Sequence, residues 1–208
     1  MYNCKYPKTM AIRIGITGGI GCGKSIVSRL LGLLDIPTYI SDNESKRLVA
    51  TDPEIRTQLT CLVGKDICPD GVLDRQLLAS YLFASDEHTR RVNAIVHPRV
   101  RDDFRHWTAL QSVRHSIVAI ESAILIEAGF ASEVDKIVMV YAPLETRIAR
   151  AARRDSASRQ QIEARIHQQA DDEAKRQQAD FVLLNDDSTP LIPQVLHMLA
   201  SLTTSTCP

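Results

Sequence analysis

The stretch that most constrains the fold is Gly18–Ser25, which reads Gly-Gly-Ile-Gly-Cys-Gly-Lys-Ser. It fits the P-loop pattern, in which a glycine and four further residues precede Gly-Lys-Ser. Glycines let backbone N–H groups turn inward around a phosphate chain, because no Cβ stands in the way. In such loops the lysine places its charge on the β- and γ-phosphates, and the serine hydroxyl binds Mg²⁺. The motif therefore predicts an ATP site formed by Gly18, Gly19, Ile20, Gly21, Cys22, Gly23, Lys24, Ser25 and Ile26, with Ser25 as the metal ligand.

The residues on either side of the loop decide between this site and a glycine-rich turn without a ligand. A P-loop needs a buried strand before it and a helix after it, and both are predicted here. Residues 12–17 are β-branched and largely apolar, and residues 26–34 carry apolar side chains at helical spacing. The helix would point the positive end of its dipole at the phosphates. The flanks therefore favour the phosphate site.

The composition is that of an ordinary globular protein. The 208 residues carry 25 basic and 25 acidic side chains, so no overall positive field suggests a nucleic-acid partner. No run approaches the about 18 apolar residues of a membrane helix. We expect residues 1–9 to be a disordered extension and not a secretory signal, with Met10 as an alternative translation start.

The five cysteines are scattered and form no Cys-x-x-Cys pair. This pattern favours reduced thiols in the cytoplasm over a disulfide framework or a zinc site. Cys22 lies inside the P-loop, where we interpret it as a small filler in preference to a redox sensor.

Strand and helix signals alternate along most of the chain, which predicts an α/β fold with a parallel sheet. Further strands are expected at 36–40, 116–121, 136–141 and 179–184, a turn of helix at 123–130 and a last helix at 191–202. From residue 52 to residue 111 only helical spacing is found, so we predict an inserted helical subdomain. The predicted division is a core of 10–50, 113–146 and 179–204, a helical substrate domain of 51–112 and a lid region of 147–178.

Two acidic residues end predicted strands, where ligands gather in parallel sheets. Asp42 follows the second strand and can face a nucleotide, although Ser41 or Asp42 could instead cap the next helix, predicted at 43–50. Glu121 ends the third strand, the place of a carboxylate near Mg²⁺.

Cations in the predicted helical subdomain could bind a substrate phosphate, although most should be solvated surface charges. They are Arg56, Lys65, Arg75, Arg90, Arg91, Arg99, Arg101 and Arg105. Pro98 should start a helix at its first turn. On the residues alone, His97 is better interpreted as a packing or capping residue than as a catalyst.

A predicted helix after Pro143 carries Arg147, Arg150 and Arg154 at steps of three and four residues, so they should share a face. A basic face at the end of a sheet strand can close over a triphosphate as a lid. The alternative is a solvated helix with ion pairs. Because a P-loop is present, we favour the lid. The stretch 158–178 that follows is polar, and we expect it to be helical and exposed.

From about residue 12 to 202 the chain resembles the dephospho-CoA kinase family. The resemblance rests on the order and spacing of Thr17–Ser25, Ser41-Asp42, Asp74-Arg75, His97-Pro98, Glu121 with Leu125-Ile126-Glu127, Arg150 with Arg154-Asp155, Gln169, and Ala179-Asp180-Phe181 through Asn185.

The resemblance implies a three-layer P-loop kinase fold and transfer of the ATP γ-phosphoryl group to the 3′-hydroxyl of dephospho-CoA. It implies Asp42 as general base, Lys24, Arg150 and Arg154 as catalytic cations, and Asn185 as a nucleotide contact. Asp42, Arg75, His97, Arg101 and Glu121 would bind the acceptor, and a monomer or small homo-oligomer is expected.

The chain departs from the family pattern at three positions. Ile40 stands where the first acid of an Asp-x-Asp pair is common, so any role of that acid is absent or shared by Glu121. Arg147 replaces a frequent glutamine and could add charge to the lid, and Ile26 replaces a frequent threonine.

Other functions with a P-loop remain to be weighed. A different nucleoside or small-molecule kinase would share the loop, Asp42 and the lid arginines and differ in the helical insertion. A GTPase is disfavoured, because no Asn-Lys-x-Asp signature occurs. A non-catalytic nucleotide-binding regulator would not need Asp42 opposite the nucleotide.

Overall fold

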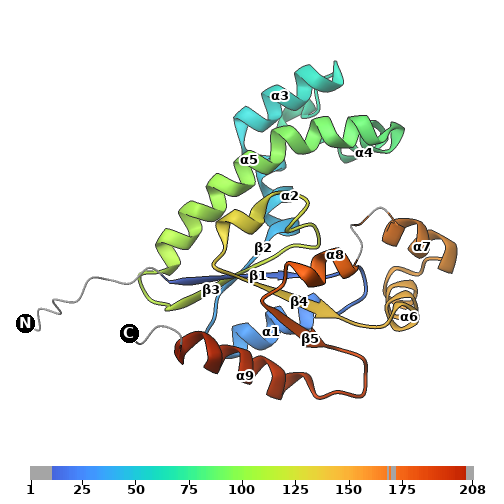
Figure 1. The fold of residues 1–208 in the computed structure, drawn as a ribbon. Helices are drawn as coiled ribbons and strands as arrows, with labels where there is room; N and C mark the ends of the chain where they lie inside the picture. Colours follow the sequence, from blue (N-terminus) through green and yellow to red (C-terminus); the bar gives the residue numbers. More distant parts are fainter. Residues whose placement is uncertain (1–10, 168, 170–171, 205–208) are drawn as a thin grey trace, which may run out of the picture. The chain divides into compact units, whose positions relative to one another are not determined.

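A computed structural model describes residues 11–167, 169 and 172–204 of the chain (Figure 1). The predicted disordered extension of residues 1–9 and the alternative start at Met10 lie outside these residues. Five strands form one parallel sheet in the order β2-β3-β1-β4-β5, which confirms the predicted α/β class. The strands are β1 (Ile12–Thr17), β2 (Thr38–Ile40), β3 (Ile117–Glu121), β4 (Lys136–Tyr141) and β5 (Phe181–Leu184).

The central strand β1 pairs with β3 on one side and β4 on the other. Ile16 lies opposite Glu121 of β3 and Val138 of β4. Side chains of all three strands are buried, as expected for a parallel sheet covered on both faces. The carboxyl end of β1 leads directly into the P-loop, so the loop lies at the edge of the sheet where parallel folds bind ligands.

Helices connect and cover the strands. The helices are α1 (Lys24–Leu33), α2 (Ser41–Thr51), α3 (Pro53–Val63), α4 (Arg75–Ala84), α5 (Asp86–Gln111), α6 (Leu144–Asp155), α7 (Arg159–His167), α8 (Asp172–Gln177) and α9 (Leu191–Thr204), with short 3₁₀ helices η1 (Pro69–Gly71) and η2 (Phe130–Glu133). Figure 1 shows α1 and α9 on one side of the sheet and α8 on the other. The main core is the layer between the sheet and these first two helices, with Val27, Leu31, Val195 and Met198 buried against Ile14.

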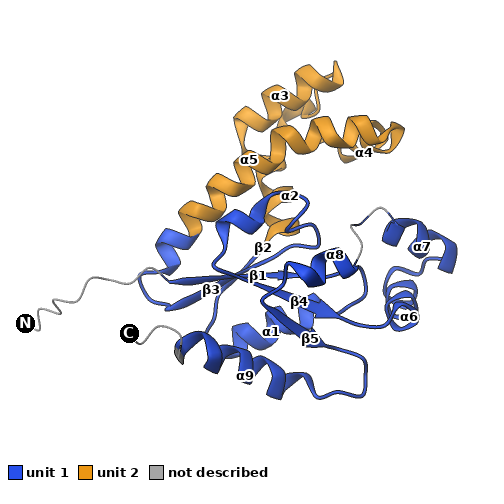
Figure 2. Cartoon of the chain, in the orientation of Figure 1, with its two compact units in different colours: residues 1–39, 108–208 blue, residues 40–107 orange. Residues whose placement is uncertain are grey.

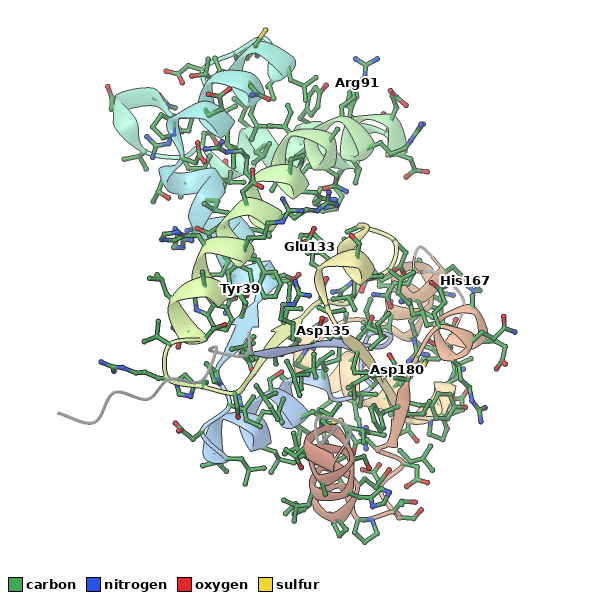
Figure 3. The ribbon with its side chains drawn as sticks, turned by 60° about the vertical axis from the view of Figure 1, so that its left-hand side comes forward. Tyr39, Arg91, Glu133, Asp135, His167 and Asp180 are labelled. Atoms are coloured by element: carbon green, nitrogen blue, oxygen red, sulfur yellow. The ribbon has the colours of Figure 1, made fainter. Side chains whose placement is uncertain are left out.

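Two carboxylates fasten the amino ends of the strands, opposite to the P-loop edge. Asp135 precedes β4 and accepts hydrogen bonds from the Arg13 backbone N–H at 2.8 Å and from its guanidinium. Asp180 precedes β5 and accepts from the Ile137 N–H at 2.8 Å and from Lys136 at 2.7 Å. Both aspartates are labelled in Figure 3. These side-chain bonds tie together the starts of β1, β4 and β5, at the end of the sheet opposite to the P-loop.

The chain divides into two compact units, residues 1–39 with 108–208 and residues 40–107 (Figure 2). In the second unit, α5 buries Val92, Val96, Val100 and Phe104 along one stripe. Asp52 begins α3 as its N-cap, and its carboxylate also binds Arg99 of α5 at 2.8 Å. The predicted three-part division of the chain stays a prediction.

Two expectations about the helices, at Pro98 and at 158–178, are corrected. Pro98 lies inside the continuous helix α5 and does not start a helix. Where a turn of helix was expected at 123–130, residues 123–129 form consecutive turns with an i→i+4 bond from the Ala128 N–H to the Ile124 carbonyl at 2.8 Å. The helical stretch at 158–178, which was expected to be exposed, contains α7 and α8, in which Ile162 and Lys175 are buried.

Candidate nucleotide site

The P-loop has the backbone conformation that its glycines predict. Gly18, Gly21 and Gly23 have φ values of 141°, 78° and 99°, a region that side chains other than glycine rarely adopt. Gly23 is also the N-cap of α1, which begins at Lys24. The loop therefore delivers the chain into the helix with the helix N-terminus facing the loop, as an anion site requires.

The Lys24 ammonium lies within the curl of the loop. Its Nζ donates to the carbonyl oxygens of Gly18 at 2.9 Å and Gly19 at 3.2 Å. Ser25 and Ile26, both exposed, continue the first turn of α1. The loop is thus bordered by the Lys24 ammonium and by the first turn of α1. This arrangement suits the binding of a chain of phosphates.

Asn185, directly after the edge strand β5, holds the loop from outside. Its Nδ2 donates to the Cys22 carbonyl at 2.8 Å. A Cβ on Gly23 would collide with this amide. Cys22 itself is fully buried, which agrees with its interpretation as a small filler. The predicted nucleotide residue Asn185 is thus a direct neighbour of the loop.

Two residues that sequence reasoning gave no role in the loop hold its tip. The Arg147 Nε donates to the Ile20 carbonyl at 3.0 Å, and the Ile20 N–H donates to the Gln169 side chain at 2.9 Å. Arg147 is only 3% exposed and forms an ion pair with Asp172, so its guanidinium is buried against the loop, and its predicted role in a lid stays a prediction. Burial of Ile148 and Ala151 turns that side of α6 inward, and the Asp172 carboxylate compensates the buried charge.

The other two lid arginines are ion-paired at the surface. Arg150 pairs with Asp187, and Arg154 binds Asp155 at 2.7 Å, which raises the pKa of the Arg154 guanidinium. Arg150 also lines a cavity of about 430 Å³ between α6 and the turn after β5. The cavity is formed by Glu145, Thr146, Ala149, Arg150, Arg153 and Asp187.

Glu121 reaches back to the helix that follows the P-loop. Its Oε2 accepts a hydrogen bond of 2.5 Å from the buried Ser28 hydroxyl. Ser28 lies three residues after Ser25 and so shares its side of α1. A hydroxyl and a carboxylate are the oxygen ligands that suit Mg²⁺, which keeps several waters. Among the described residues, no three His, Cys, Asp or Glu side chains form a metal cluster of their own.

Asp42 does not cap a helix. Helix α2 begins at Ser41, its N-cap is Ile40, and no side chain caps it, so the capping alternative for Ser41 or Asp42 is wrong. Asp42 is exposed in the first turn, where a negative charge is favoured by the helix dipole. Its carboxylate accepts no hydrogen bond from residues 11–167, 169 or 172–204, which leaves it available to a ligand.

The remaining acceptor candidates belong to α4 and α5 of the second unit. Arg75 is the exposed first residue of α4, whose N-cap Asp74 accepts from the Leu77 N–H at 2.9 Å. His97 and Arg101 are one turn apart on α5. Burial and the nearby Arg101 charge lower the pKa of the His97 imidazole, which favours its neutral form. His97 lies within α5, so the capping interpretation is wrong and packing remains.

A parallel α/β sheet with a glycine-rich loop after β1 and a lysine as the first residue of α1 defines a P-loop nucleotide-binding protein. The described part of the chain holds no helix that is long and apolar enough to cross a membrane.

Comparisons with known proteins specify the family within this class. The family described as dephospho-CoA kinase matches residues 12–190. A dephospho-CoA kinase from Bacteroides fragilis strain YCH46 is 57% identical over 193 residues, covering 93% of this chain and 94% of the relative. The chain belongs to the dephospho-CoA kinase family, whose members are kinases of coenzyme A biosynthesis.

Solved structures share the fold. The crystal structure of TT1252 from Thermus thermophilus is 30% identical, with a TM-score of 0.78, and the match covers 96% of this chain and 100% of that one. A dephospho-CoA kinase from Campylobacter jejuni is 22% identical, with a TM-score of 0.67 over 94% and 98% of the two chains, and supports the fold alone.

Proposed function

We propose that the chain transfers the γ-phosphoryl group of ATP to the 3′-hydroxyl of the dephospho-CoA ribose, giving CoA and ADP. The bond from the γ-phosphorus to the bridging oxygen of ADP breaks, a bond to the ribose oxygen forms, and the hydroxyl proton leaves. The observation that carries the proposal is the P-loop with Lys24 inside its curl, in a chain of this family.

The residues around the loop supply the positive charge that phosphoryl transfer requires. Inward N–H groups, the N-terminus of α1 and the Lys24 ammonium would bind the β- and γ-phosphates. Arg150 and Arg154 would neutralise the transferring group, with Arg150 exchanging its Asp187 partner for phosphate. Asn185 would keep the loop closed around the nucleotide by holding the Cys22 carbonyl.

We infer that Mg²⁺ takes part, with Ser25 as its protein ligand. Glu121, held by Ser28, would act through water and cover the role of the acid that Ile40 replaces. Bound Mg²⁺ would neutralise phosphate charge during the transfer. The Ser25 hydroxyl would hold the ion at the N-terminus of α1, beside the phosphates.

We infer that Asp42 receives the proton of the ribose hydroxyl. Its carboxylate is exposed and unbonded within the described residues, so it can accept a hydrogen bond from a substrate alcohol. Arg75, His97 and Arg101 would bind the acceptor, because cations and neutral imidazole donors suit its diphosphate and ribose. A cytoplasmic location and a monomer or small homo-oligomer also remain predictions.

The acceptor is tested with a panel of alcohols in the presence of ATP and Mg²⁺. We expect ADP release with dephospho-CoA and little release with adenosine or other nucleosides, and ³¹P NMR of the product should show a 3′-phosphomonoester. Phosphorylation of a nucleoside without phosphorylation of dephospho-CoA would favour the alternative nucleoside or small-molecule kinase.

The base is tested by Asp42→Asn, which keeps the shape of the side chain and removes its charge. We expect a loss of turnover of about 10²–10⁴-fold, the usual contribution of general acid–base catalysis, with unchanged ATP affinity. Asp86→Asn is the matched control, because Asp86 is likewise an exposed acid in the first turn of a helix, α5. Near-normal turnover of Asp42→Asn would refute the role of Asp42.

A further inference from the structure

The peptide groups at the tip of the P-loop are held from outside the loop. The Ile20 carbonyl accepts from the Arg147 Nε, and the Ile20 N–H donates to Gln169. These partners lie 127 and 149 positions further along the chain, in the segment that follows β4. The direction in which the Ile20 peptide points is therefore set by tertiary contacts as well as by the glycines.

The guanidinium of Arg147 lies directly against the loop. A Cβ on Gly19 would collide with the guanidinium, and one on Gly21 would collide with the Arg147 backbone. No larger residue fits at Gly19 or Gly21 while Arg147 keeps this position. The close approach explains why the loop needs glycine at position 19, which has no positive φ, and gives a second reason for glycine at position 21, whose φ is 78°.

Arg147 is held in turn by a second ion pair through α8. Its guanidinium pairs with Asp172, the first residue of α8. One turn further, the ammonium of Lys175, which is 1% exposed, binds the Glu127 carboxylate at 3.0 Å and the Ala123 carbonyl at 3.1 Å. Helix α8 is thus anchored to the turn after β3 and presents Asp172 to Arg147.

A planar guanidinium is suited to this position because it can serve two acceptors at once. Its Nε binds the Ile20 carbonyl while another nitrogen binds Asp172, and a lysine ammonium at the end of a flexible stem would lack this fixed fork. Because the charge is buried, losing Asp172 leaves it uncompensated and frees it to move. The position of the loop tip then depends on the order of α8.

We propose that Arg147, held by Asp172, is a positioning residue that fixes the P-loop tip for nucleotide binding. It touches the loop and not the reacting atoms, so its loss weakens nucleotide binding more than the chemical step. The proposal rests on the proposed binding of ATP by the P-loop. By linkage it also requires nucleotide binding to stabilise α8, since coupling between two sites is reciprocal.

The test compares Arg147→Lys and Asp172→Asn with the wild type. Affinity for a non-hydrolysable ATP analogue is measured by titration, and the KM values for ATP and dephospho-CoA are measured beside kcat. We expect the analogue affinity and the KM for ATP to worsen about tenfold, the loss of one charge-assisted hydrogen bond, with little change in kcat or in the KM for dephospho-CoA.

The control is Arg159→Lys. Arg159 also carries a guanidinium in this part of the chain, but it is exposed, and two of its nitrogens bind the Glu145 carboxylate oxygens at 2.7 Å. This substitution should leave the analogue affinity unchanged. A merely structural role of Arg147 would lower the melting temperature of the variants without changing analogue affinity, and that result overturns the proposal.

Hydrogen exchange of the wild-type protein supplies a readout that needs no variant. The analogue should slow exchange of the amides of α8, and unchanged exchange there overturns the proposal even if both variants fail to fold. Analogue binding is measured without an acceptor. Failure to phosphorylate dephospho-CoA would therefore refute the proposed function without affecting the test of Arg147 in nucleotide binding.

Discussion

Lys24 brings the positive charge that the P-loop itself lacks. Its ammonium donates to the carbonyls of Gly18 and Gly19, so its position beside the loop is already fixed. We expect Lys24→Ala to lower kcat/KM for ATP by at least about 10²–10³-fold, the range for loss of one preorganised donor. Steady-state kinetics measures the loss, and thermal unfolding checks that the fold persists. A folded variant with full activity would contradict the role of Lys24 in phosphate binding.

Gly23 allows the conformation of the P-loop in two ways, through its positive φ and because it has no Cβ beside the Asn185 amide. Alanine there would adopt a left-handed conformation at a cost of about 1–2 kcal/mol and would push the Asn185 amide away from Cys22. We expect Gly23→Ala to lower both the free energy of unfolding and the nucleotide affinity, as measured by urea unfolding and titration with an ATP analogue.

Gly32 is the matched control for Gly23, because it lies in the same helix with nothing near its missing Cβ. Gly32→Ala should raise the free energy of unfolding by about 0.5–1 kcal/mol, since alanine is the better helix former. If Gly23→Ala were as well tolerated as Gly32→Ala, the strained turn would not be needed.

Single residues could be predicted from the sequence where their expected roles depend on local spacing. Gly18–Ser25 can be recognised because one short segment carries the glycines, the lysine and the hydroxyl. The burial of Arg147 could not be predicted, because it follows from contacts with Ile20 and Asp172 that are distant along the chain. The one available signal was the departure from glutamine at Arg147.

Among the elements, α5 shows how tertiary packing overrides a local signal. A proline usually ends or starts a helix, because it lacks an N–H and clashes with the preceding turn. Pro98 nevertheless lies within α5, since the buried stripe from Val92 to Phe104 continues past it. The sequence predicts a helix from residue 43, whereas α2 begins at Ser41. The first residues of α2 were not predicted because no side-chain cap marks its start.

The turn between β5 and α9 depends on one carboxylate. Asp186 accepts hydrogen bonds from the backbone N–H groups of Thr189 at 2.7 Å and Ser188 at 3.0 Å, which lower the pKa of Asp186 to about 2. An unfolded aspartate has a pKa of about 3.9. The stability that Asp186 contributes is therefore present above about pH 4 and is lost as the pH falls towards 2.

We expect Asp186→Asn to unfold at lower urea concentration than the wild type at pH 6, with a smaller difference between the two proteins at pH 3. Urea unfolding at both pH values measures the two differences. A difference that stayed constant between pH 6 and pH 3 would show that the Asp186 charge does not stabilise the turn.

For the whole molecule, the class of fold follows from the alternation of strands and helices, and the sheet confirms it. The extent of the helical unit is harder to predict, because it depends on which helices pack together. In the structure this unit begins at residue 40, and Arg47 of α2 binds Asp103 of α5 at 2.7 Å within it. Such pairs of distant residues leave no periodic signal in the sequence.

In the proposed reaction the P-loop holds ATP while its γ-phosphoryl group passes to dephospho-CoA. This transfer is tested most directly by a single-turnover reaction with ATP labelled in the γ-phosphate, excess enzyme and dephospho-CoA. We expect the label to move from ATP into CoA, with one ADP formed for each labelled CoA. Label that stayed in ATP, or that appeared only as inorganic phosphate, would contradict the proposed reaction.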